Sequence, residues 1–470
     1  MSGPRIVVVG GGLAGIAAAL CCVDAGASVT LLERRPRLGG ATWSFARRGL
    51  WYDNGQHVFL RCCTAYQAFL ARIGAEDGVR LQDRLAVPVV APGGRRAWLR
   101  RHRLPAPLHL APSLAGYRHL PPGWRLRAAA GALALRGVDP DDPGADAVTF
   151  ADWLTAHGQN GATIEAVWDL IGRPTLNVTA AEASLAQAAM VFRTGLLGDP
   201  AAADIGWARV PLSQLHAAPA ARALTRAGAE IRCGAAVEAV ERGSHGGPAV
   251  RLGPGRAGES GGIEVIAADG VVVATPPPVA AGLLPPGTLP GPVERLGTSP
   301  IVNVTVVYDR RVTDLPLAAG IGTPVQWVFD RTEPAGLRRG QCLGVSLSAA
   351  DAYIGRRPAD LVALFTAALA ALFPAAGRAR VEDAVVTREP AATFRCRPGT
   401  RALRPGARTG LPGVTLAGAW TATGWPATME GAVRSGLTAA EAILCPSAPA
   451  APFDPATPAL VGGPAPRGAG

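Results

Sequence analysis

The stretch Arg5–Glu33, which reads RIVVVGGGLAGIAAALCCVDAGASVTLLE, decides the fold of this 470-residue chain. It begins with a β-branched run at Arg5–Val9, passes through closely spaced glycines, and continues as an alanine-rich segment to about Ala25. A second apolar run follows at Ser28–Leu32. This order predicts a strand, a tight turn, a helix and a second strand, which is the unit that binds a dinucleotide.

The glycines and the acid of this stretch each suit one task in such a site. Gly10 allows the tight turn, Gly12 lets the backbone approach a pyrophosphate, and Gly15 lets the helix pack on the strand. The helix N-terminus offers free N–H groups to phosphate, and Glu33 stands at the spacing of a ribose-binding acid. From this stretch we predict cofactor contacts by Gly10, Gly12, Leu13, Ala14, Gly15, Glu33 and Arg34.

Composition narrows the class of protein. A hydrophobic fraction of 49% supports large cores, and the length favours two domains over one. The net charge is +11, but every basic residue is arginine and most are scattered along the chain. Because no zinc finger, basic helix or RNA-binding motif accompanies them, the sequence predicts no nucleic-acid partner.

The cysteines and histidines predict neither a disulfide framework nor a metal site. Eight cysteines are present, with adjacent pairs at Cys21–Cys22 and Cys62–Cys63 and no C-x-x-C spacing. The seven histidines show no ligand spacing with cysteines or acids. We therefore expect a reducing compartment and no bound metal. The glycine pattern of the N-terminal stretch also argues against an export signal.

A second glycine pair follows the ribose acid and indicates which dinucleotide is bound. The segment RRPRLGGATWSF carries Gly39 and Gly40 and resembles the second glycine motif of the FAD-dependent amine oxidase and phytoene desaturase superfamily. The resemblance implies FAD, with contacts from Gly39, Gly40 and Ala41. The superfamily has an arginine where this chain has Ala41, so we expect Arg34, Arg35 or Arg37 to supply the missing charge.

The C-terminal segment LAGAWTATGWPATMEG resembles the part of the same superfamily that closes over the flavin. The resemblance implies a strand, a loop, and a helix whose N-terminus faces the flavin ring. It also implies that the backbone near Val237 meets the adenine. One departure is Ala419, where the superfamily has an acid. The implied contacts are Val237, Gly418, Ala419, Trp425, Pro426, Ala427 and Thr428.

Further motifs extend the resemblance from Arg5 to about Leu444. DNGQHVF, LPAPLHLAPSL, PTLN, FRTGLLGDPAAADIGWARVPLSQLH and GWPATMEGAVRSG together resemble the squalene-associated FAD-dependent desaturases, the hydroxysqualene dehydroxylase family. The resemblance implies reductive removal of the hydroxyl of a C30 isoprenoid alcohol in hopanoid or related triterpene synthesis. It also implies functional association with other squalene-synthesis enzymes. The candidate acids or orienting groups are Asp53, His57 and Glu430.

Two alternatives remain open from the sequence. One is a carotenoid-type desaturase that oxidises a polyprene such as phytoene. The other is a FAD-poor lipid-binding protein on the same fold, which Ala41 and Ala419 suggest because two cofactor contacts are replaced.

The order of motifs predicts an α/β fold with interleaved domains. We expect a Rossmann-like FAD domain of amine-oxidase type from residues 1–85, 205–295 and 395–445, and a substrate domain with a mixed sheet and helices from 86–204 and 296–394. Strands are expected within 301–330, and helices at Leu361–Phe373 and Met429–Leu444. The segment DIGWARVPLSQLH is expected to be a loop running into a helix, and 446–470 a disordered tail.

The segment Ala86–Leu135 combines clustered arginines with leucine, tyrosine and tryptophan. Prolines interrupt it, so it is not a transmembrane span. Such a composition suits a peripheral contact with the inner face of the cell membrane, in an otherwise cytoplasmic protein. An amphipathic cover on the substrate domain explains it equally well. The clustered arginines are Arg95, Arg96, Arg100, Arg101 and Arg103.

Overall fold

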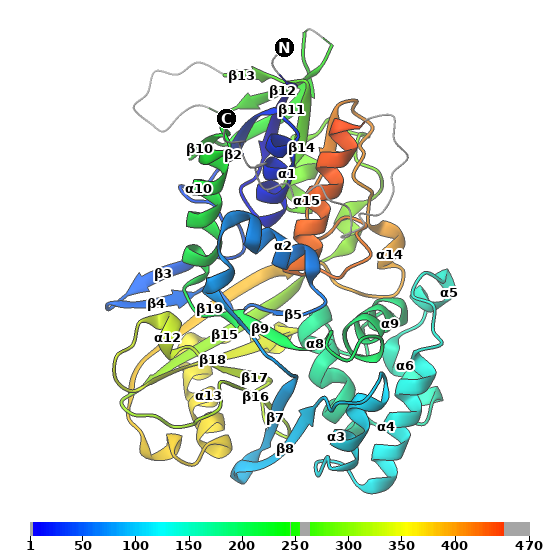
Figure 1. Cartoon of the computed structure of the whole chain (residues 1–470), viewed down its shortest axis with the longest axis vertical. Helices are drawn as coiled ribbons and strands as arrows, with labels where there is room; N and C mark the ends of the chain where they lie inside the picture. The colour runs from blue at the N-terminus through cyan, green and yellow to red at the C-terminus, as the bar shows by residue number, and fades with distance from the viewer. Residues whose placement is uncertain (1–2, 245, 254–263, 446–470) are drawn as a thin grey trace, which may run out of the picture.

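A parallel sheet lies at the upper end of the molecule in the orientation of Figure 1. The computed structural model describes residues 3–244, 246–253 and 264–445, so the predicted tail at 446–470 lies outside the described residues. The strand order is β10-β2-β1-β14-β20, and all four pairings are parallel. The strands are β1 (Arg5–Val9), β2 (Ser28–Glu33), β10 (Glu230–Cys233), β14 (Gly270–Val273) and β20 (Val414–Leu416).

Helices α1 (Leu13–Asp24) and α15 (Met429–Leu444) pack together beside this sheet, as both views show. The strand, helix and strand predicted for the opening stretch are confirmed, and so is the helix predicted at Met429–Leu444. Neighbouring elements are α2 (Thr64–Ile73), α10 (Ala218–Arg226), α11 (Pro277–Leu283), β11 (Val237–Arg242), β12 (Pro248–Leu252) and β13 (Val265–Ala267).

A seven-stranded mixed sheet forms the second layer, in the order β19-β15-β18-β17-β16-β7-β8. Its strands come from two segments of the chain: β7 (Ala86–Ala91), β8 (Arg95–Arg100), β15 (Ser299–Tyr308), β16 (Leu317–Gly320), β17 (Trp327–Asp330), β18 (Gln341–Ser348) and β19 (Val381–Thr393). Alternate valines of β15, among them Val302 and Val304, pack on Phe365 and Leu369 of α13 (Pro358–Leu372). The strands predicted within 301–330 and the helix near 361–373 are confirmed.

A group of helices fills the remaining corner of the molecule (Figure 1). Its core contains the aromatic rings of Phe150, Trp168 and Phe192, whose centroids lie 5.2–5.7 Å apart. The helices are α3 (Ala111–Ala115), α4 (Pro122–Leu135), α5 (Pro143–Asp146), α6 (Phe150–Ala156), α7 (Gly161–Thr163), η4 (Ile164–Trp168), α8 (Asp169–Leu176), α9 (Leu185–Phe192) and η5 (Arg193–Leu197). Across the described ranges no helix is both long and apolar enough to cross a membrane.

Two smaller sheets accompany these layers. The hairpin of β3 (Ser44–Arg47) and β4 (Leu50–Asp53) projects from the molecule, whereas β9 (Ile205–Ala208) lies between β5 (Val58–Leu60) and β6 (Val79–Leu81). The predicted loop at DIGWARVP is therefore wrong, because Ile205–Ala208 finds partners on both sides that are distant in sequence. The short elements are η1 (Glu76–Gly78), η2 (Pro92–Gly94), η3 (Leu108–Leu110), η6 (Ser213–Ala217), η7 (Val293–Leu296), α12 (Thr332–Ala335), η8 (Ala350–Ala352), η9 (Ala376–Arg378) and α14 (Thr400–Leu403).

The contact between α1 and α15 depends on a glycine. A Cβ atom added at Gly436 would lie 2.1 Å from the carbonyl oxygen of Ala14 and 3.0 Å from the Cβ of Ala17. The middle of α15 therefore lies against the first turn of α1, with no room for a side chain between them.

We predict that Gly436→Ala destabilises the protein, although alanine is the better helix former. Overpacking costs about 1–3 kcal/mol, which exceeds the gain of about 1 kcal/mol in helix propensity. Urea unfolding followed by circular dichroism measures the change. The matched control is Gly123→Ala in α4, where an added Cβ meets nothing within 4 Å. A G436A midpoint at or above that of the wild type would contradict the packing argument.

Candidate flavin site

The two glycine motifs lie against each other. A Cβ at Gly40 would stand 2.7 Å from the Cα of Gly12, and the N–H of Gly39 donates to the carbonyl of Gly11 at 2.8 Å. A Cβ at Gly15 would lie 1.9 Å from the carbonyl oxygen of Gly10, so the helix begins directly on the turn. The glycines therefore build a cradle whose wall is bare backbone.

The start of α1 leaves donors available in this cradle. The N–H groups of Leu13, Ala14 and Gly15 donate to no acceptor in the described part of the chain, and all three residues are buried. Gly12 caps the helix in an extended conformation without a side-chain bond. Buried donors at a helix N-terminus need an acceptor, and a pyrophosphate supplies one. The residues present thus fit the phosphates of a dinucleotide.

Glu33 lies at the end of β2, where the first motif predicts the ribose. One carboxylate oxygen accepts the N–H of Gly11 at 2.8 Å and the other accepts the N–H of Arg35 at 2.7 Å. Each oxygen retains a further lone pair for a hydroxyl. The N–H of Ala235 donates to the carbonyl of Glu33, which brings the start of β11 and Val237 to this end of the cradle.

Two arginines flank the position where Ala41 replaces the superfamily's arginine. Arg35 donates through Nη1 to the carbonyl of Gly40 at 3.3 Å, and the guanidinium of Arg37 lies 4.6 Å from the centroid of the Trp43 ring. Burial, followed by the charge of Arg35, lowers the pKa of Arg37. Neither arginine forms an ion pair within the described ranges, so both remain available to an anion. Arg34 is exposed.

The C-terminal loop and the start of α15 form the opposite wall. The N–H of Gly418, a residue with φ of 146°, donates to Ser435 Oγ at 2.8 Å, and Thr428 Oγ1 caps α15 by accepting the N–H of Gly431 at 3.1 Å. The N–H groups of Met429 and Glu430 have no acceptor among the residues described. Trp425 and Ala427 are half-buried beside this turn and Pro426 is buried.

Arg404 supports this loop and was not predicted. Its guanidinium is buried and donates to the carbonyls of Ala419 at 3.1 Å, of Trp420 at 3.4 Å and of Thr421. It also lies 4.8 Å from the centroid of the Phe394 ring. Burial lowers the pKa of Arg404 to about 10, so the group stays charged at neutral pH. The loop at Ala419 is therefore held by a cation that binds its carbonyls.

Glu430 occupies a closed network. Its carboxylate accepts the N–H groups of Ala65 at 3.2 Å and Tyr66 at 2.7 Å, at the start of α2, and pairs with Arg434 at 2.6 Å. Burial raises the pKa of the Glu430 carboxyl, and the charge of Arg434 opposes that rise. Only 1% of Glu430 is exposed, so of the two predicted roles, acid or orienting group, its position favours orienting, by docking α2 on α15.

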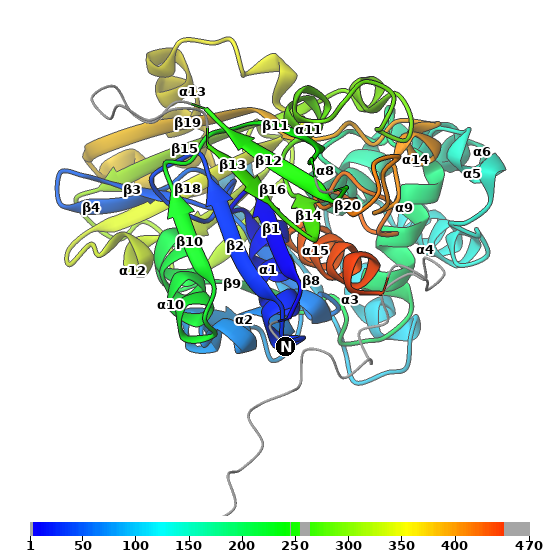
Figure 2. The same cartoon turned by 90° about the horizontal axis from the view of Figure 1, so that it is seen from above.

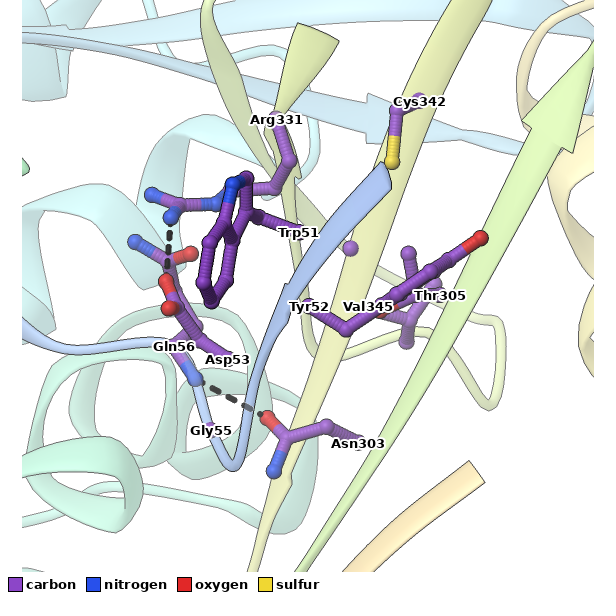
Figure 3. A pocket seen from close by; sticks show the side chains of 11 residues that line it. Trp51, Tyr52, Asp53, Gly55, Gln56, Asn303, Thr305, Arg331, Cys342 and Val345 are labelled. Carbon is purple, nitrogen blue, oxygen red and sulfur yellow. Dashed lines mark hydrogen bonds and ion pairs between the residues drawn. The ribbon is translucent and has the colours of Figure 1, made fainter. Parts of the chain in front are cut away.

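Asp53 also holds structure together. One carboxylate oxygen accepts from Ser44 Oγ at 2.6 Å and from the N–H of Leu212 at 3.0 Å, while the other pairs with Arg331. Figure 3 shows Asp53 and Arg331 pointing toward each other beside Trp51, in a pocket between the β4 hairpin and the mixed sheet. Because its oxygens are used, Asp53 is better placed to fix the two layers than to donate a proton.

His57 is the candidate whose ring remains partly free. Its Nδ1 donates to the carbonyl of Gly55 at 3.0 Å, which leaves Nε2 for a ligand. Burial lowers the pKa of His57. A second imidazole that the motifs did not single out, His216 on η6, is fully buried and shares a 2.7 Å hydrogen bond with the hydroxyl of Tyr66. Burial, followed by the charge of His57, lowers the pKa of His216 to about 3.

The described residues contain no group of three or more histidines, cysteines or acids that is arranged to bind a metal ion. All eight cysteines are free thiols.

A glycine cradle at the carboxyl ends of parallel strands, closed by a second helix N-terminus above a separate mixed sheet, is the site of a dinucleotide-binding protein. The chain matches the family described as flavin containing amine oxidoreductase over residues 13–444 and belongs to it. It is therefore a flavin-dependent oxidoreductase, and the predicted flavin cofactor is confirmed. This membership argues against the alternative of a FAD-poor binding protein.

Relatives with named activities cover nearly the whole chain. The hydroxysqualene dehydroxylase of Rhodopseudomonas palustris is 30% identical over 456 residues, which span 93% of this chain and 97% of that protein. The predicted resemblance to that family is thereby confirmed. The 15-cis-phytoene desaturase of Solanum lycopersicum is 24% identical over 468 residues, or 94% of this chain and 77% of that protein.

Solved structures support the fold alone. Cyclohexylamine oxidase from Brevibacterium oxydans matches with a TM-score of 0.69 and 21% identity, covering 94% of this chain and 98% of that one. A triple mutant of putrescine oxidase matches with a TM-score of 0.71 and 19% identity, covering 94% and 99%. The predicted amine-oxidase-type fold is confirmed.

Because the pKa of His216 is lowered, we predict that the free energy of unfolding falls at acid pH. The folded protein keeps this imidazole neutral down to about pH 3, whereas the unfolded chain protonates it near pH 6.5. The contribution of the neutral His216 imidazole to the free energy of unfolding is complete above pH 6.5 and is lost as the pH falls toward 3. Between about pH 7.5 and about pH 5, the free energy of unfolding should fall by about 2 kcal/mol from this residue, and His57 adds to the fall.

Urea unfolding of the FAD-bound protein across that range measures the decline. His216→Phe should flatten it, whereas His157→Phe, at an exposed histidine whose ring stacks on Trp153, should leave it unchanged. An equally steep decline in H216F would show that other groups carry the acid sensitivity.

Proposed function

We propose that this enzyme removes the hydroxyl group of hydroxysqualene by reduction and releases squalene. The observation that carries the proposal is the 30% identity with a hydroxysqualene dehydroxylase over nearly the full length of both proteins. Reduced FAD supplies the hydride when bound. The overall change replaces a C–O bond by a C–H bond and consumes one proton and one hydride, with water as the second product.

The protein's share of this reaction is to position an allylic alcohol, exclude water, and deliver a proton to the departing oxygen. His57 is the proton donor that we propose. With Nδ1–H fixed on the Gly55 carbonyl, only Nε2 can take up and release the proton. Because burial lowers the pKa of His57, the protonated ring is a stronger acid than a free imidazolium. Asp53 and Glu430 are held in the contacts described above.

His57→Asn should abolish most turnover and leave FAD bound. The asparagine amide can still donate to the Gly55 carbonyl, but no group replaces Nε2. A loss of about 10²–10⁴-fold in kcat is expected for a missing general acid. Squalene formation from hydroxysqualene with reduced FAD, followed by gas chromatography, measures it. Wild-type turnover in the H57N variant would remove His57 from the mechanism.

The same assay tests the substrate itself. The more distant resemblance to phytoene desaturases supports a second candidate, the oxidation of a polyprene by oxidised FAD. Wild-type protein that consumes phytoene and forms no squalene would establish that candidate in place of the first.

We also propose that one face of α4 contacts a membrane, from which a C30 hydrocarbon enters. Leu126 is 74% exposed and Leu133 is 57% exposed, and a spacing of seven residues places both on one side of the helix. The exposed Arg127 and Arg136 lie next to this face, and α4 contains no acid. An apolar stripe beside arginines suits an anionic bilayer.

Two arginines of the cluster at 95–103 already have partners within the protein. Arg101, which belongs to the predicted basic cluster, pairs with the buried carboxylate of Asp204 at 2.6 Å and so is not a free surface cation. Arg100 stacks on the Trp98 ring at 3.7 Å. The leucines of α4 therefore give the better test.

Replacing Leu126 and Leu133 together by serine should weaken flotation with anionic liposomes at least tenfold, because both side chains would lose burial in the lipid. The control is Val265→Ser, at a valine in β13 that is 55% exposed at a site remote in sequence. Equal flotation of the double variant and the control would contradict a membrane contact through α4.

A further inference from the structure

The hydrogen-bond partners of His216 are incomplete. The side chain is fully buried, its Nε2 lies 2.7 Å from the hydroxyl of Tyr66, and its Nδ1 has no partner. With the Tyr66 hydroxyl donating to Nε2, the neutral ring carries its hydrogen on Nδ1. A buried N–H without an acceptor is costly, and in native proteins such a group usually meets a water or ligand.

The place of His216 in the fold indicates which ligand. Its neighbour Ala217 lies 3.6 Å from a Cβ added at Gly39, and Ser213 of the same turn accepts the N–H of Ser44 through Oγ at 2.8 Å. The η6 turn therefore packs against the segment that follows the second glycine pair. The turn that carries His216 therefore lies beside Gly39 of the cradle.

Tyr66 connects His216 to the opposite wall. The N–H of Tyr66 donates to the carboxylate of Glu430 in the first turn of α15. Helix α2, which carries Tyr66, lies between α10 and α15 in Figure 1 and contacts both. The Tyr66–His216 pair thus bridges the two segments that face each other across the cofactor site.

Two residues of α15 mark the two ends of the cradle, the end for the phosphates and the end for the flavin ring. Gly436 lies on the first turn of α1, where the phosphates are expected. Glu430 precedes it by six residues, which corresponds to about 9 Å along the helix. Through Tyr66, whose N–H binds Glu430, His216 is linked to the end of the cradle beyond the phosphates, where the ring system of the cofactor belongs.

We propose that His216 binds FAD directly, with its Nδ1–H donating to an acceptor on the heteroatom edge of the isoalloxazine ring, while Tyr66 fixes the ring of His216 through Nε2. The isoalloxazine edge presents carbonyl oxygens and ring nitrogens, which are the acceptors that a buried N–H donor requires. This inference rests on the flavin site and not on which alcohol or polyprene the enzyme takes.

Two variants of His216 separate its nitrogens. His216→Asn places an amide donor near the position of Nδ1 and loses the hydrogen bond with the Tyr66 hydroxyl. His216→Gln reaches toward the position of Nε2, where it keeps the Tyr66 contact, and leaves Nδ1 unreplaced. We expect H216Q to bind FAD about tenfold more weakly and to shift the visible flavin spectrum, and H216N to stay within about threefold of the wild type.

The measurements are FAD titration of the deflavinated full-length protein and the absorbance spectrum of the loaded protein. Tyr66→Phe is the matched control, because it removes the partner of Nε2 and should lower the urea midpoint with little change in FAD affinity. If the role of His216 were only structural, H216N and Y66F would be less stable than the wild type. H216N, H216Q and Y66F would then all bind FAD as the wild type does. That result, or equal FAD affinity for H216Q and the wild type, would overturn the proposal.

Discussion

The contact between the first turn of α1 and the middle of α15 is the constraint on which the rest depends. Gly436 leaves room only for the backbone of Ala14, so the packing fixes two helices that lie more than four hundred residues apart in sequence. The donors at the N-terminus of α1 and those at the start of α15 are thereby held in one arrangement. The cofactor site follows from this packing, because each helix supplies part of its N–H donors.

Polar and charged side chains of the β3–β4 hairpin join the layers. Asp53 pairs with Arg331, and Arg47 and Tyr52 both reach Asp383 on β19, at 3.2 Å and 3.0 Å. These contacts explain why Asp53, the acid of the DNGQHVF motif, is better suited to holding the layers together than to proton transfer. A carboxylate that accepts from the backbone and from an arginine orients two layers well, and for the same reason it is a poor proton donor.

The strands and helices that frame the nucleotide site could be predicted from the sequence, because their signals are local. The opening stretch carries its own strand, turn and helix signals, and Met429–Leu444 begins at Thr428, a side chain that caps helices well. The rest depends on contacts between distant segments. Nothing local marks Ile205–Ala208 as the centre of a small sheet, and nothing in TRALRPG indicates that Arg404 binds the carbonyls of residues 419–421. His216, Asp53 and Glu430 are of the same kind, since partners distant in sequence decide which of their atoms are free.

The strand order β10-β2-β1-β14-β20 sets the order of events during protein synthesis. The first two strands and α1 leave the ribosome early, but β1 gains its second neighbour only when Gly270–Val273 has been made, and α15 comes later still. Until then the apolar edge of β1 and the bare donors of α1 have no native partner. The nascent chain therefore exposes these segments until β14 and α15 have been made, and both walls of the cofactor site exist only after α15.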